Sequence, residues 1–341
     1  MKMQFRTLFG TAVLLLALGV GTAMAGNADR IGTAGGQELT IPNSARGLAL
    51  GGGAVADAGG VEMLWYNPAA IASVRNVEAY FSNLSYIADM DKSYVAVAVK
   101  GGFGTIAVSA DVLQIGDIIE TTEDAPEGTG RVFSPNFSIL GLSYGRYMTD
   151  QVRIGTTLKV VNESILNEQA TGVTFDAGIL YRPGPRGVSF GLALKNFGPN
   201  MQFTGSDFES FHRTADNPNA NDRALASQSA AFELPSYFEL GARYEVGMGE
   251  TSELAGYGSF RSNNFNNDEV KVGAEYSYEQ TVFLRGGGVL SANDDYLFGP
   301  AFGAGVAIPV GAQSVIYADY TLRTVSDYFD DNHMFAVKFE F

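Results

Sequence analysis

The chain has no cysteine, only two histidines and a single tryptophan among its 341 residues. Without cysteine it can form no disulfide, no thiolate metal site and no lipid anchor at a lipobox cysteine. Neither His212 nor His333 has a second histidine at ligand spacing, so we expect no histidine-based metal site.

Positive charge is also scarce, because 22 Lys and Arg stand against 37 Asp and Glu, a net charge of -15. This balance argues against nucleic acid and anionic membrane surfaces as partners. The glycine triplets at 51–53 and 286–288 lie outside any Walker or Rossmann pattern. We therefore expect no catalytic residue and no cofactor, and we interpret the chain as a non-enzyme.

The first residues have the pattern of a secretory signal peptide. Lys2 and Arg6 precede an apolar run at 8–20, and Ala23-Met24-Ala25 forms a cleavage site. We expect residues 1–25 to be removed after Sec export. No later apolar run reaches the roughly 18 residues of a membrane helix. The abundance of Gly (42), Phe (23) and Tyr (16) in an acidic exported chain is typical of a transmembrane β-barrel, with a secreted soluble β-protein as the alternative.

Alternation of apolar and polar residues decides between these two classes. In 237–246, Phe238, Leu240 and Ala242 share one face, while Glu239 and Arg243 share the other, as in a strand that faces two environments. An even number of such segments, each of roughly ten residues, is typical of a transmembrane antiparallel barrel. Fourteen segments are predicted, at 76–87, 91–100, 103–116, 134–148, 151–162, 169–182, 188–197, 235–246, 251–262, 268–279, 281–290, 296–308, 312–324 and 332–341.

The links between these segments give an independent check. Links after even-numbered segments are short, whereas several links after odd-numbered segments are long, above all 117–133 and 198–234. Outer-membrane barrels have short periplasmic turns and long external loops, and a soluble β-sandwich has no reason to sort its loops in this way. We therefore predict an all-β chain, a fourteen-stranded transmembrane antiparallel barrel at 76–341, in the bacterial outer membrane.

The charged faces of the strands predict the lining of the barrel. Backbone amides in lipid must all pair, so the sheet has to close on itself. A Lys or Arg facing lipid at mid-bilayer would cost about 2–4 kcal/mol, which places the charged faces inside. We expect neighbours of opposite sign, such as Arg243 with Glu245, Lys271 with Glu275 and Asp319 with Arg323. The predicted lumen charges are Arg153, Lys159, Asp176, Glu239, Arg243, Lys271, Glu275, Arg285, Asp319 and Arg323.

Residues 26–75 precede the barrel and are too rich in glycine for membrane strands. Because a fourteen-stranded barrel has a lumen wide enough for water unless something fills it, we predict that this segment starts on the periplasmic side and folds inward as a hatch. A disordered periplasmic leader is the alternative, but Leu64, Trp65 and Ile71 argue against disorder. The predicted hatch residues are Arg46, Trp65, Asn67, Pro68 and Ala69.

The order of motifs resembles a known family. Residues 41–74, IPNSARGLALGGGAVADAGGVEMLWYNPAAIASV, followed by a strand, resemble the amino-terminal signature of the PorV/PorQ family and, more distantly, FadL-type outer-membrane transporters. EGTGRVF at 127–133, LSYGRYM at 142–148 and VKVGAEY at 270–276 continue the resemblance. It implies a fourteen-stranded barrel with an inserted hatch. The last segment, which ends on Phe341, resembles the signal recognised by barrel-assembly machinery.

Three functions stay open at this point. The closer resemblance implies an accessory of type IX protein secretion, with a translocon and secreted cargo proteins as partners and the loops 117–133 and 198–234 as the cargo surface. The FadL-like resemblance implies uptake of hydrophobic small molecules through a lateral opening gated by the hatch. The third interpretation is a structural barrel with a closed lumen. Outer-membrane lipid is a partner in all three.

Overall fold

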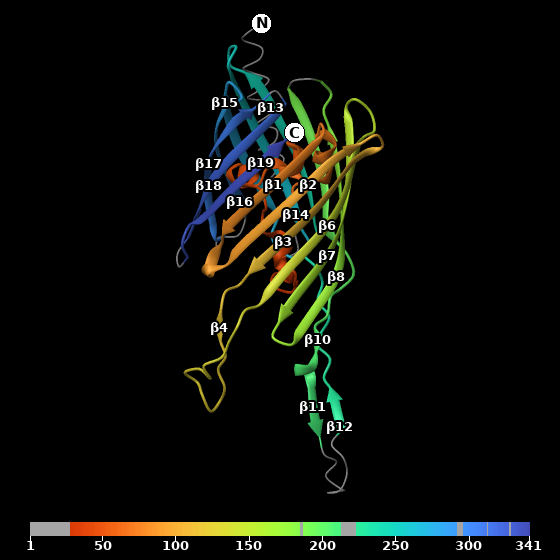
Figure 1. Ribbon diagram of the computed structural model, residues 1–341, viewed down its shortest axis with the longest axis vertical. Helices are drawn as coiled ribbons and strands as arrows, with labels where there is room; N and C mark the ends of the chain where they lie inside the picture. The colour runs from red at the N-terminus through yellow and green to blue at the C-terminus, as the bar shows by residue number, and fades with distance from the viewer. Residues whose placement is uncertain (1–27, 185–186, 213–222, 292–295, 312, 327–328) are drawn as a thin grey trace.

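The computed structural model describes residues 28–341 except 185–186, 213–222, 292–295, 312 and 327–328. The predicted leader, residues 1–25, lies outside the described residues. Fourteen strands form one closed antiparallel sheet (Figure 1), and β19 closes the ring by pairing with β1. The barrel strands are β1 Val77–Ser85, β2 Asp91–Gly101, β3 Gly104–Gln114, β6 Asn136–Tyr147, β7 Val152–Ile165, β8 Glu168–Tyr181, β9 Val188–Phe197, β13 Tyr237–Gly247, β14 Ser252–Asn263, β15 Glu269–Tyr278, β16 Val282–Ser291, β17 Phe298–Val310, β18 Ser314–Val325 and β19 Asn332–Glu340.

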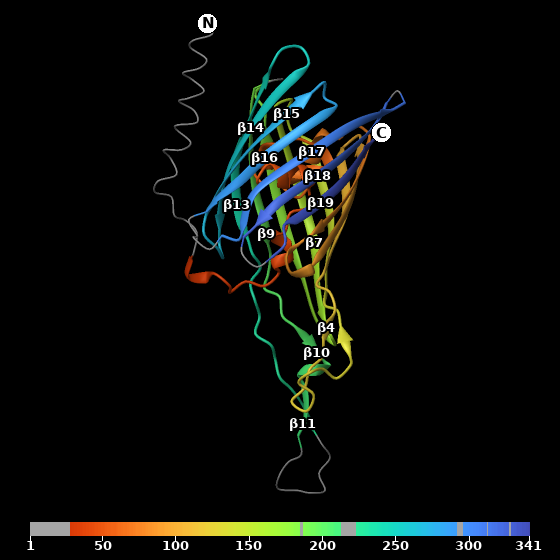
Figure 2. The same ribbon diagram turned by 90° about the vertical axis from the view of Figure 1, so that its left-hand side faces the viewer.

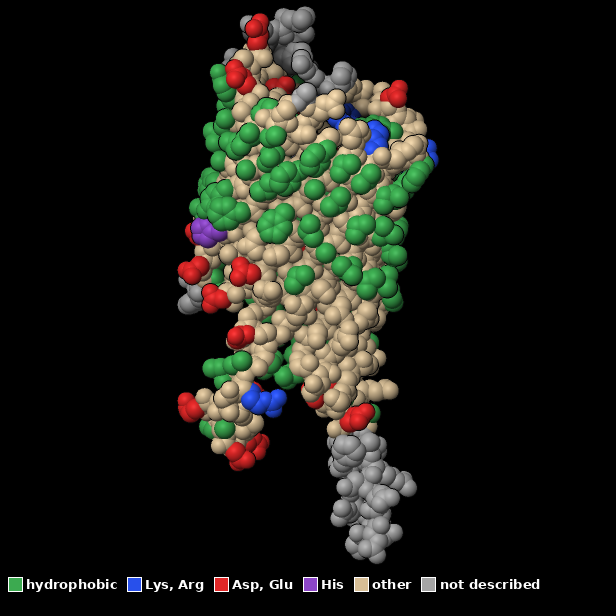
Figure 3. Space-filling model, viewed as in Figure 1, with side chains coloured by type: hydrophobic (Ala, Val, Ile, Leu, Met, Phe, Trp, Pro, Cys, Tyr) green, Lys and Arg blue, Asp and Glu red, His purple; other side chains and the backbone are tan. Residues whose placement is uncertain are grey.

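The alternation in the sequence is the reason for the two faces of the wall. On β13, Leu240 is 49% exposed whereas Glu239 is 2% exposed, because successive side chains of a strand point to opposite faces. Large apolar side chains cover the outside of the barrel in a broad band (Figure 3), and carboxylates gather towards its ends. An outward apolar band is what a transmembrane barrel presents to lipid. The predicted fold class, a transmembrane fourteen-stranded barrel, is confirmed.

The two ends of the barrel differ in their connections. The turns at 102–103, 148–151 and 279–281 are short and lie at the end where the chain finishes, the upper end in Figure 1. The opposite end carries the long links, which extend well beyond the wall (Figures 1 and 2). These links contain β4 Ile118–Ile119 paired with β5 Val132–Phe133, β10 Thr204–Gly205 on the edge of β8, η8 Ser206–Phe208, and β11 Glu209–His212 paired with β12 Arg223–Ala226. A further 3-10 turn, η7 Ile87–Asp89, joins β1 to β2.

Residues 37–74, called the inner segment from here on, lie inside the barrel (Figures 1 and 2) as a chain of short turns. None of the helices in the described part of the chain is long and apolar enough to cross a membrane. The inner segment contains η3 Gln37–Thr40, α2 Ala45–Ala49, η4 Ala54–Ala56, η5 Gly60–Met63 and η6 Pro68–Ser73, and η2 Ala28–Arg30 precedes it.

The direction of this segment differs from the expectation. Arg30 pairs with Glu233 at 2.6 Å, and the Gly35 amide donates to the Glu233 carbonyl at 3.1 Å. Glu233 belongs to the link before β13, at the end with the long loops, whereas residue 76 enters β1 at the end with the short turns. The described chain therefore begins at the outer mouth and crosses the barrel before its first strand, so the prediction of a periplasmic start was wrong for these residues.

Candidate functional site

Local capping determines the turns of the inner segment. The Ser44 side chain accepts a hydrogen bond from the Gly47 amide at 3.1 Å and caps α2. The Asn67 side chain accepts from the Ala69 amide at 3.0 Å, and Pro68 occupies the first position of η6. Both are favoured arrangements at a helix start, because a side-chain oxygen satisfies a free amide and proline lacks the amide that would otherwise be unpaired.

Inward-facing glycines of the wall let the inner segment approach the strands closely. A Cβ added at Gly287 would lie 2.3 Å from the carbonyl carbon of Leu50, and one at Gly178 would lie 1.9 Å from Asn67 Oδ1. The Asn67 amide also donates to the Ile179 carbonyl of β8 at 3.2 Å. In the glycine triplet of β16, the central residue Gly287 is required because the inner segment packs directly on the strand backbone there.

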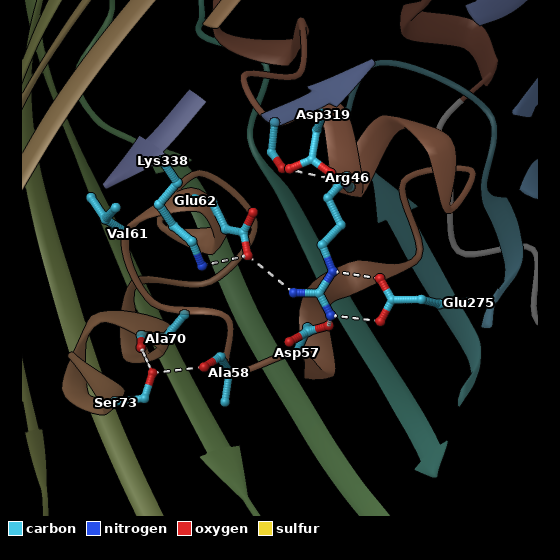
Figure 4. A network of polar contacts seen from close by, with 12 residues as sticks. Arg46, Asp57, Ala58, Val61, Glu62, Ala70, Ser73, Glu275, Asp319 and Lys338 are labelled. Atoms are coloured by element: carbon cyan, nitrogen blue, oxygen red, sulfur yellow. Dashed lines mark hydrogen bonds and ion pairs between the residues drawn. The ribbon is translucent and has the colours of Figure 1, made fainter. Parts of the chain in front are cut away.

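Arg46 is the centre of an ion-pair network between the inner segment and the wall (Figure 4). Its guanidinium donates to Asp57 at 2.8 Å, to Glu62 at 3.0 Å and to both oxygens of Glu275 at 2.8 and 3.0 Å. The same nitrogen that contacts Asp57 also reaches the Tyr257 hydroxyl at 3.3 Å. Because Asp57 and Glu62 come from the inner segment and Glu275 from β15, one side chain fixes the fold of the segment and attaches it to the barrel.

The network continues through the carboxylates that Arg46 contacts. Lys338 of β19 lies 3.2 Å from Glu62, and Arg285 of β16 lies 2.6 Å from Glu275. Arg285 also donates to Asp319 of β18. Buried charges persist when each has a partner of opposite sign and its hydrogen bonds are satisfied. Charged side chains of β15, β16, β18 and β19 therefore hold one face of the inner segment.

The charges of this network are stable at neutral pH. Burial alone would raise the pKa of Asp57, but the guanidinium groups of Arg46 and Arg243 outweigh it and hold that pKa below its ordinary value. Burial alone would lower the pKa of Arg46, yet Asp57 and then Glu275 raise it well above its ordinary range. Asp57 is thus ionised and Arg46 protonated at neutral pH.

A second cluster holds the other end of the inner segment. Lys195 of β9 donates to the Trp65 carbonyl at 2.6 Å and pairs with Asp176 of β8 at 2.6 Å. Lys159 of β7 pairs with the same carboxylate at 2.7 Å and donates to Asn196 at 2.8 Å. Asn196 adopts a left-handed φ of 58° and follows Lys195 into the interior, so β9 carries an extra inward residue where its register with β8 shifts. Such a bulge redirects a side chain at the cost of regular pairing.

A third cluster, of carboxyl groups, lies near the outer end of the inner segment. Glu38 is 2% exposed, and its side chain lies against that of Glu163, with which it shares a hydrogen bond. Burial, and next the negative charge of Glu163, raise the pKa of Glu38 to about 8, whereas Lys92 lowers it and Asp111 raises it to a smaller extent. Lys92 pairs with Asp111 at 3.0 Å and donates to the backbone carbonyl of Glu38 at 3.1 Å. Glu38 therefore carries a proton at neutral pH.

A cavity of about 200 Å³ lies between the inner segment and β14 to β18, at the end of the barrel with the long loops. Its floor includes Leu48, Gly51 and Gly52 of the inner segment, and its charged lining is Arg261, Glu269, Lys271 and Arg323. Concave sites with many aromatic walls and a few polar groups are typical binding sites for small molecules. The aromatic lining residues are Trp65, Tyr66, Tyr86, Phe265, Tyr296 and Phe298.

The predicted site residues occupy different places. All five hatch candidates belong to the inner segment: Arg46 centres the ion-pair network, Trp65 lines the cavity, and Asn67, Pro68 and Ala69 form the turn against β7 and β8. Arg153 is partly exposed at the rim with the short turns, with its guanidinium 4.8 Å from the Tyr147 ring, apart from the inner clusters. The other predicted lumen charges lie inside: Lys159, Asp176, Glu239, Arg243, Lys271, Glu275, Arg285, Asp319 and Arg323.

Two of the expected pairings were wrong. Lys271 lies 3.3 Å from Glu239 and 3.5 Å from Glu269, rather than beside Glu275, which Arg46 and Arg285 occupy. Asp319 pairs with Arg285 instead of Arg323. Residues four apart on one strand share a face but lie about 13 Å apart along it, whereas partners on adjacent strands lie side by side.

Sequence reasoning missed several members of the site. The alternation of β19 could have found Lys338, because its neighbours Val337 and Phe339 share the outer face. Asp57, in the glycine-rich stretch before Trp65, is 4% exposed and paired with Arg46. Nothing in the local sequence identifies such a partner. Further missed residues are Glu38, Glu62, Tyr66, Lys92, Asp111, Glu163, Lys195, Asn196, Arg261 and Glu269.

Comparison with known proteins shows which solved structures share the fold of this chain. No family model matches the chain, and no curated protein matches its sequence. Among solved structures it is similar to the Pseudomonas putida toluene transporter TodX, with a TM-score of 0.57 at 12% identity over 87% of this chain and 96% of that one. It is also similar to the monoaromatic hydrocarbon channel CymD (0.54, 12%, 88% and 98%) and to a Pseudomonas aeruginosa FadL homologue (0.52, 12%, 88% and 98%).

These similarities establish a shared fold. The chain has the FadL-like outer-membrane barrel fold, with fourteen antiparallel strands around an inner segment. They support the more distant of the two resemblances read from the sequence. The PorV/PorQ resemblance has no counterpart among these structures.

Proposed function

We propose that the protein is an outer-membrane channel for hydrophobic small molecules, and that residues 37–74 act as its hatch. The observation that carries the proposal is the cavity at the outer mouth, which has aromatic walls and the inner segment as its floor. The fold shared with a toluene transporter and a monoaromatic hydrocarbon channel supports it. A small apolar molecule entering this cavity from outside would exchange water for aromatic surface, which is the main driving force for such binding.

In this proposal the hatch separates two compartments of the lumen. Below the cavity, the Arg46 network and the Lys195 cluster join the inner segment to the wall through side chains of β8, β9, β15, β16 and β19. A ligand can pass only if part of the inner segment moves or if the wall opens beside it. Buried ion pairs suit such a role because their geometry is directional and they can re-form after a movement. We infer that the glycine-rich stretch at 51–53 supplies the local freedom, since Gly51 and Gly52 have φ of 65° and 79°.

A second candidate keeps the role in type IX secretion that the PorV/PorQ resemblance implies. The observation that favours it is the pair of long external links, 117–133 and 198–234, which extend beyond the wall and carry short hairpins (Figure 1). Exposed apolar side chains such as Ile119 and Val132, each 59% exposed, would suit contact with a protein partner. This interpretation has less support than the channel, since the three structural neighbours described above are two channels and a FadL homologue.

Native mass spectrometry of the protein, purified gently from its own outer membranes, separates these candidates. The channel proposal predicts a monomer that carries an apolar small molecule, and denaturation should release that molecule for identification. Co-purification of a translocon or a secreted protein would move the assignment to secretion. A bare monomer that also fails to bind added toluene would leave the closed structural barrel as the interpretation.

A further inference from the structure

Arg323 is a cation inside the barrel without a carboxylate partner in the described chain. Its guanidinium lies over the Phe298 ring, 3.7 Å from the centroid, and 5.9 Å from the centroid of Tyr86. With its amide oxygen turned to the guanidinium, Asn332 accepts from Arg323 Nη2 at 2.6 Å and Nε at 3.2 Å. A neutral amide, the Tyr86 hydroxyl and two rings hold the guanidinium in place, but they do not cancel its charge.

The other charged residues that line the cavity do not balance the positive charge of Arg323. Arg261 pairs with Glu239 at 2.8 Å, and Lys271 lies between Glu239 and Glu269 at 3.3 and 3.5 Å. Two cations thus face two carboxylates across β13, β14 and β15. Arg323, on the opposite side of the cavity, adds a third positive charge to these lining groups. A partly desolvated cation in this position favours an anion in the cavity.

Tyr66 also lines this cavity, and its hydroxyl is a second unsatisfied group, buried close to the cavity. The Tyr66 hydroxyl is buried, and no group of the described chain forms a hydrogen bond with it. Burial raises the pKa of this hydroxyl above its ordinary value, so it remains a neutral donor at working pH. Buried polar groups in proteins nearly always have a partner, so a polar ligand group or water that reached this hydroxyl would satisfy it.

The size and walls of the cavity limit the rest of the ligand. A dry cavity of about 150 Å³ is large enough for benzene, so about 200 Å³ accommodates one ring with a small substituent. Trp65, Tyr86 and Phe298 supply ring faces and edges for a flat molecule. We propose that this cavity binds single-ring aromatic acids, with the carboxylate on Arg323 and the ring among the aromatic side chains.

The chemistry differs from that of a neutral hydrocarbon in one respect. A carboxylate oxygen would accept from the Arg323 guanidinium, which lines the cavity and has no carboxylate partner in the described chain. Hydrogen bonds to charged groups contribute more than neutral ones. Transport of the bound acid across the membrane rests on the proposed channel function. Binding itself does not, because binding to the cavity can be measured without transport.

The single tryptophan makes the measurement direct. Trp65 is the only tryptophan of the chain and lines the cavity, so its fluorescence in the detergent-solubilised full-length protein reports occupancy. Three probes are titrated: benzoate, its neutral isostere benzamide, and toluene. We expect benzoate to bind at least about tenfold more tightly than benzamide, as one charge-assisted contact implies. Equal affinities for benzoate and benzamide would overturn the proposal without any variant.

Two variants complete the test. Arg323→Met should weaken benzoate binding by about 10- to 100-fold and leave toluene binding within about twofold. Arg153→Met, which removes a rim arginine apart from the cavity, should change neither. If toluene binds and Arg323→Met binds benzoate as tightly as the wild type does, the proposed ligand class is refuted. The proposed channel function is unaffected by that result. Arg323-dependent benzoate binding in a protein that admits no solute to cells would refute the channel and leave the binding site standing.

Discussion

Replacing Arg46 with methionine should release the inner segment from the wall. Arg46→Met keeps most of the volume of the side chain but removes a guanidinium with contacts to Asp57, Glu62 and Glu275. Each carboxylate keeps another cation: Arg243 at 3.9 Å for Asp57, Lys338 at 3.2 Å for Glu62, and Arg285 at 2.6 Å for Glu275. The free energy of docking of the inner segment should therefore fall by about 3 kcal/mol, the lower end of the cost of breaking a buried ion pair.

That cost has a measurable consequence. About 3 kcal/mol corresponds to roughly a hundredfold change in the ratio of docked to undocked inner segment. Hydrogen exchange of the full-length protein, followed by mass spectrometry, reports this ratio for amides of residues 45–64 that are bonded within the segment, such as Leu48 to Ser44 and Leu64 to Val61. Their protection should fall by about a hundredfold in Arg46→Met, while protection of the barrel strands stays unchanged.

Arg153→Met is the matched control, because Arg153 contacts the Tyr147 ring at the rim and joins none of the inner clusters. Unchanged protection of residues 45–64 in Arg46→Met would refute the reasoning. So would an equal loss in the rim variant, because the effect would then be unrelated to the network.

Three other predictions follow from the same packing. Deletion of residues 37–74 should leave a barrel that inserts and resists detergent but admits small hydrophilic solutes; unchanged entry of such solutes into cells would contradict the hatch. Gly287→Ala places a Cβ 2.3 Å from backbone of the inner segment and should destabilise its docking by about 1–3 kcal/mol, whereas the control Gly286→Ala, whose nearest atom lies at 3.7 Å, should be nearly neutral in the same exchange assay. Because the pKa of Glu38 is raised from 4.5 to about 8, the folded state binds its proton more tightly, and stability falls as pH rises from about 4.5 to about 8. Protection of residues 37–41 should thus increase between pH 9 and pH 6 in the wild type, and a similar increase in Glu38→Gln would rule out this carboxyl as the cause.

The barrel was predictable because its signal is local and repeated. Strict alternation over segments such as 237–246 specifies both a strand and its outward face, and a closed ring is the only way to satisfy such strands in lipid. The sorting of loop lengths then orients the barrel. These features need no knowledge of which side chains meet.

The inner contacts depend on distances across the fold, which the local pattern does not contain. Arg46 and Glu275 are separated by 229 positions, and no periodicity relates them. Lys271 was expected beside Glu275 because both share a face of β15. It pairs instead with Glu239, which lies on another strand. Asn196 faces inward only because the strand bulges there. The path of residues 28–36 to the outer mouth depends on Arg30 and Glu233, which are likewise far apart in sequence.

The entry of labelled toluene into cells with an intact outer membrane tests the central claim most directly. Entry is measured at low external toluene concentration in cells that produce the full-length protein and in matched cells that do not. The channel account predicts faster entry with the protein, and entry of a hydrophilic solute of similar size should stay the same. Equal rates of toluene entry, with the protein correctly inserted in the outer membrane, would contradict the account.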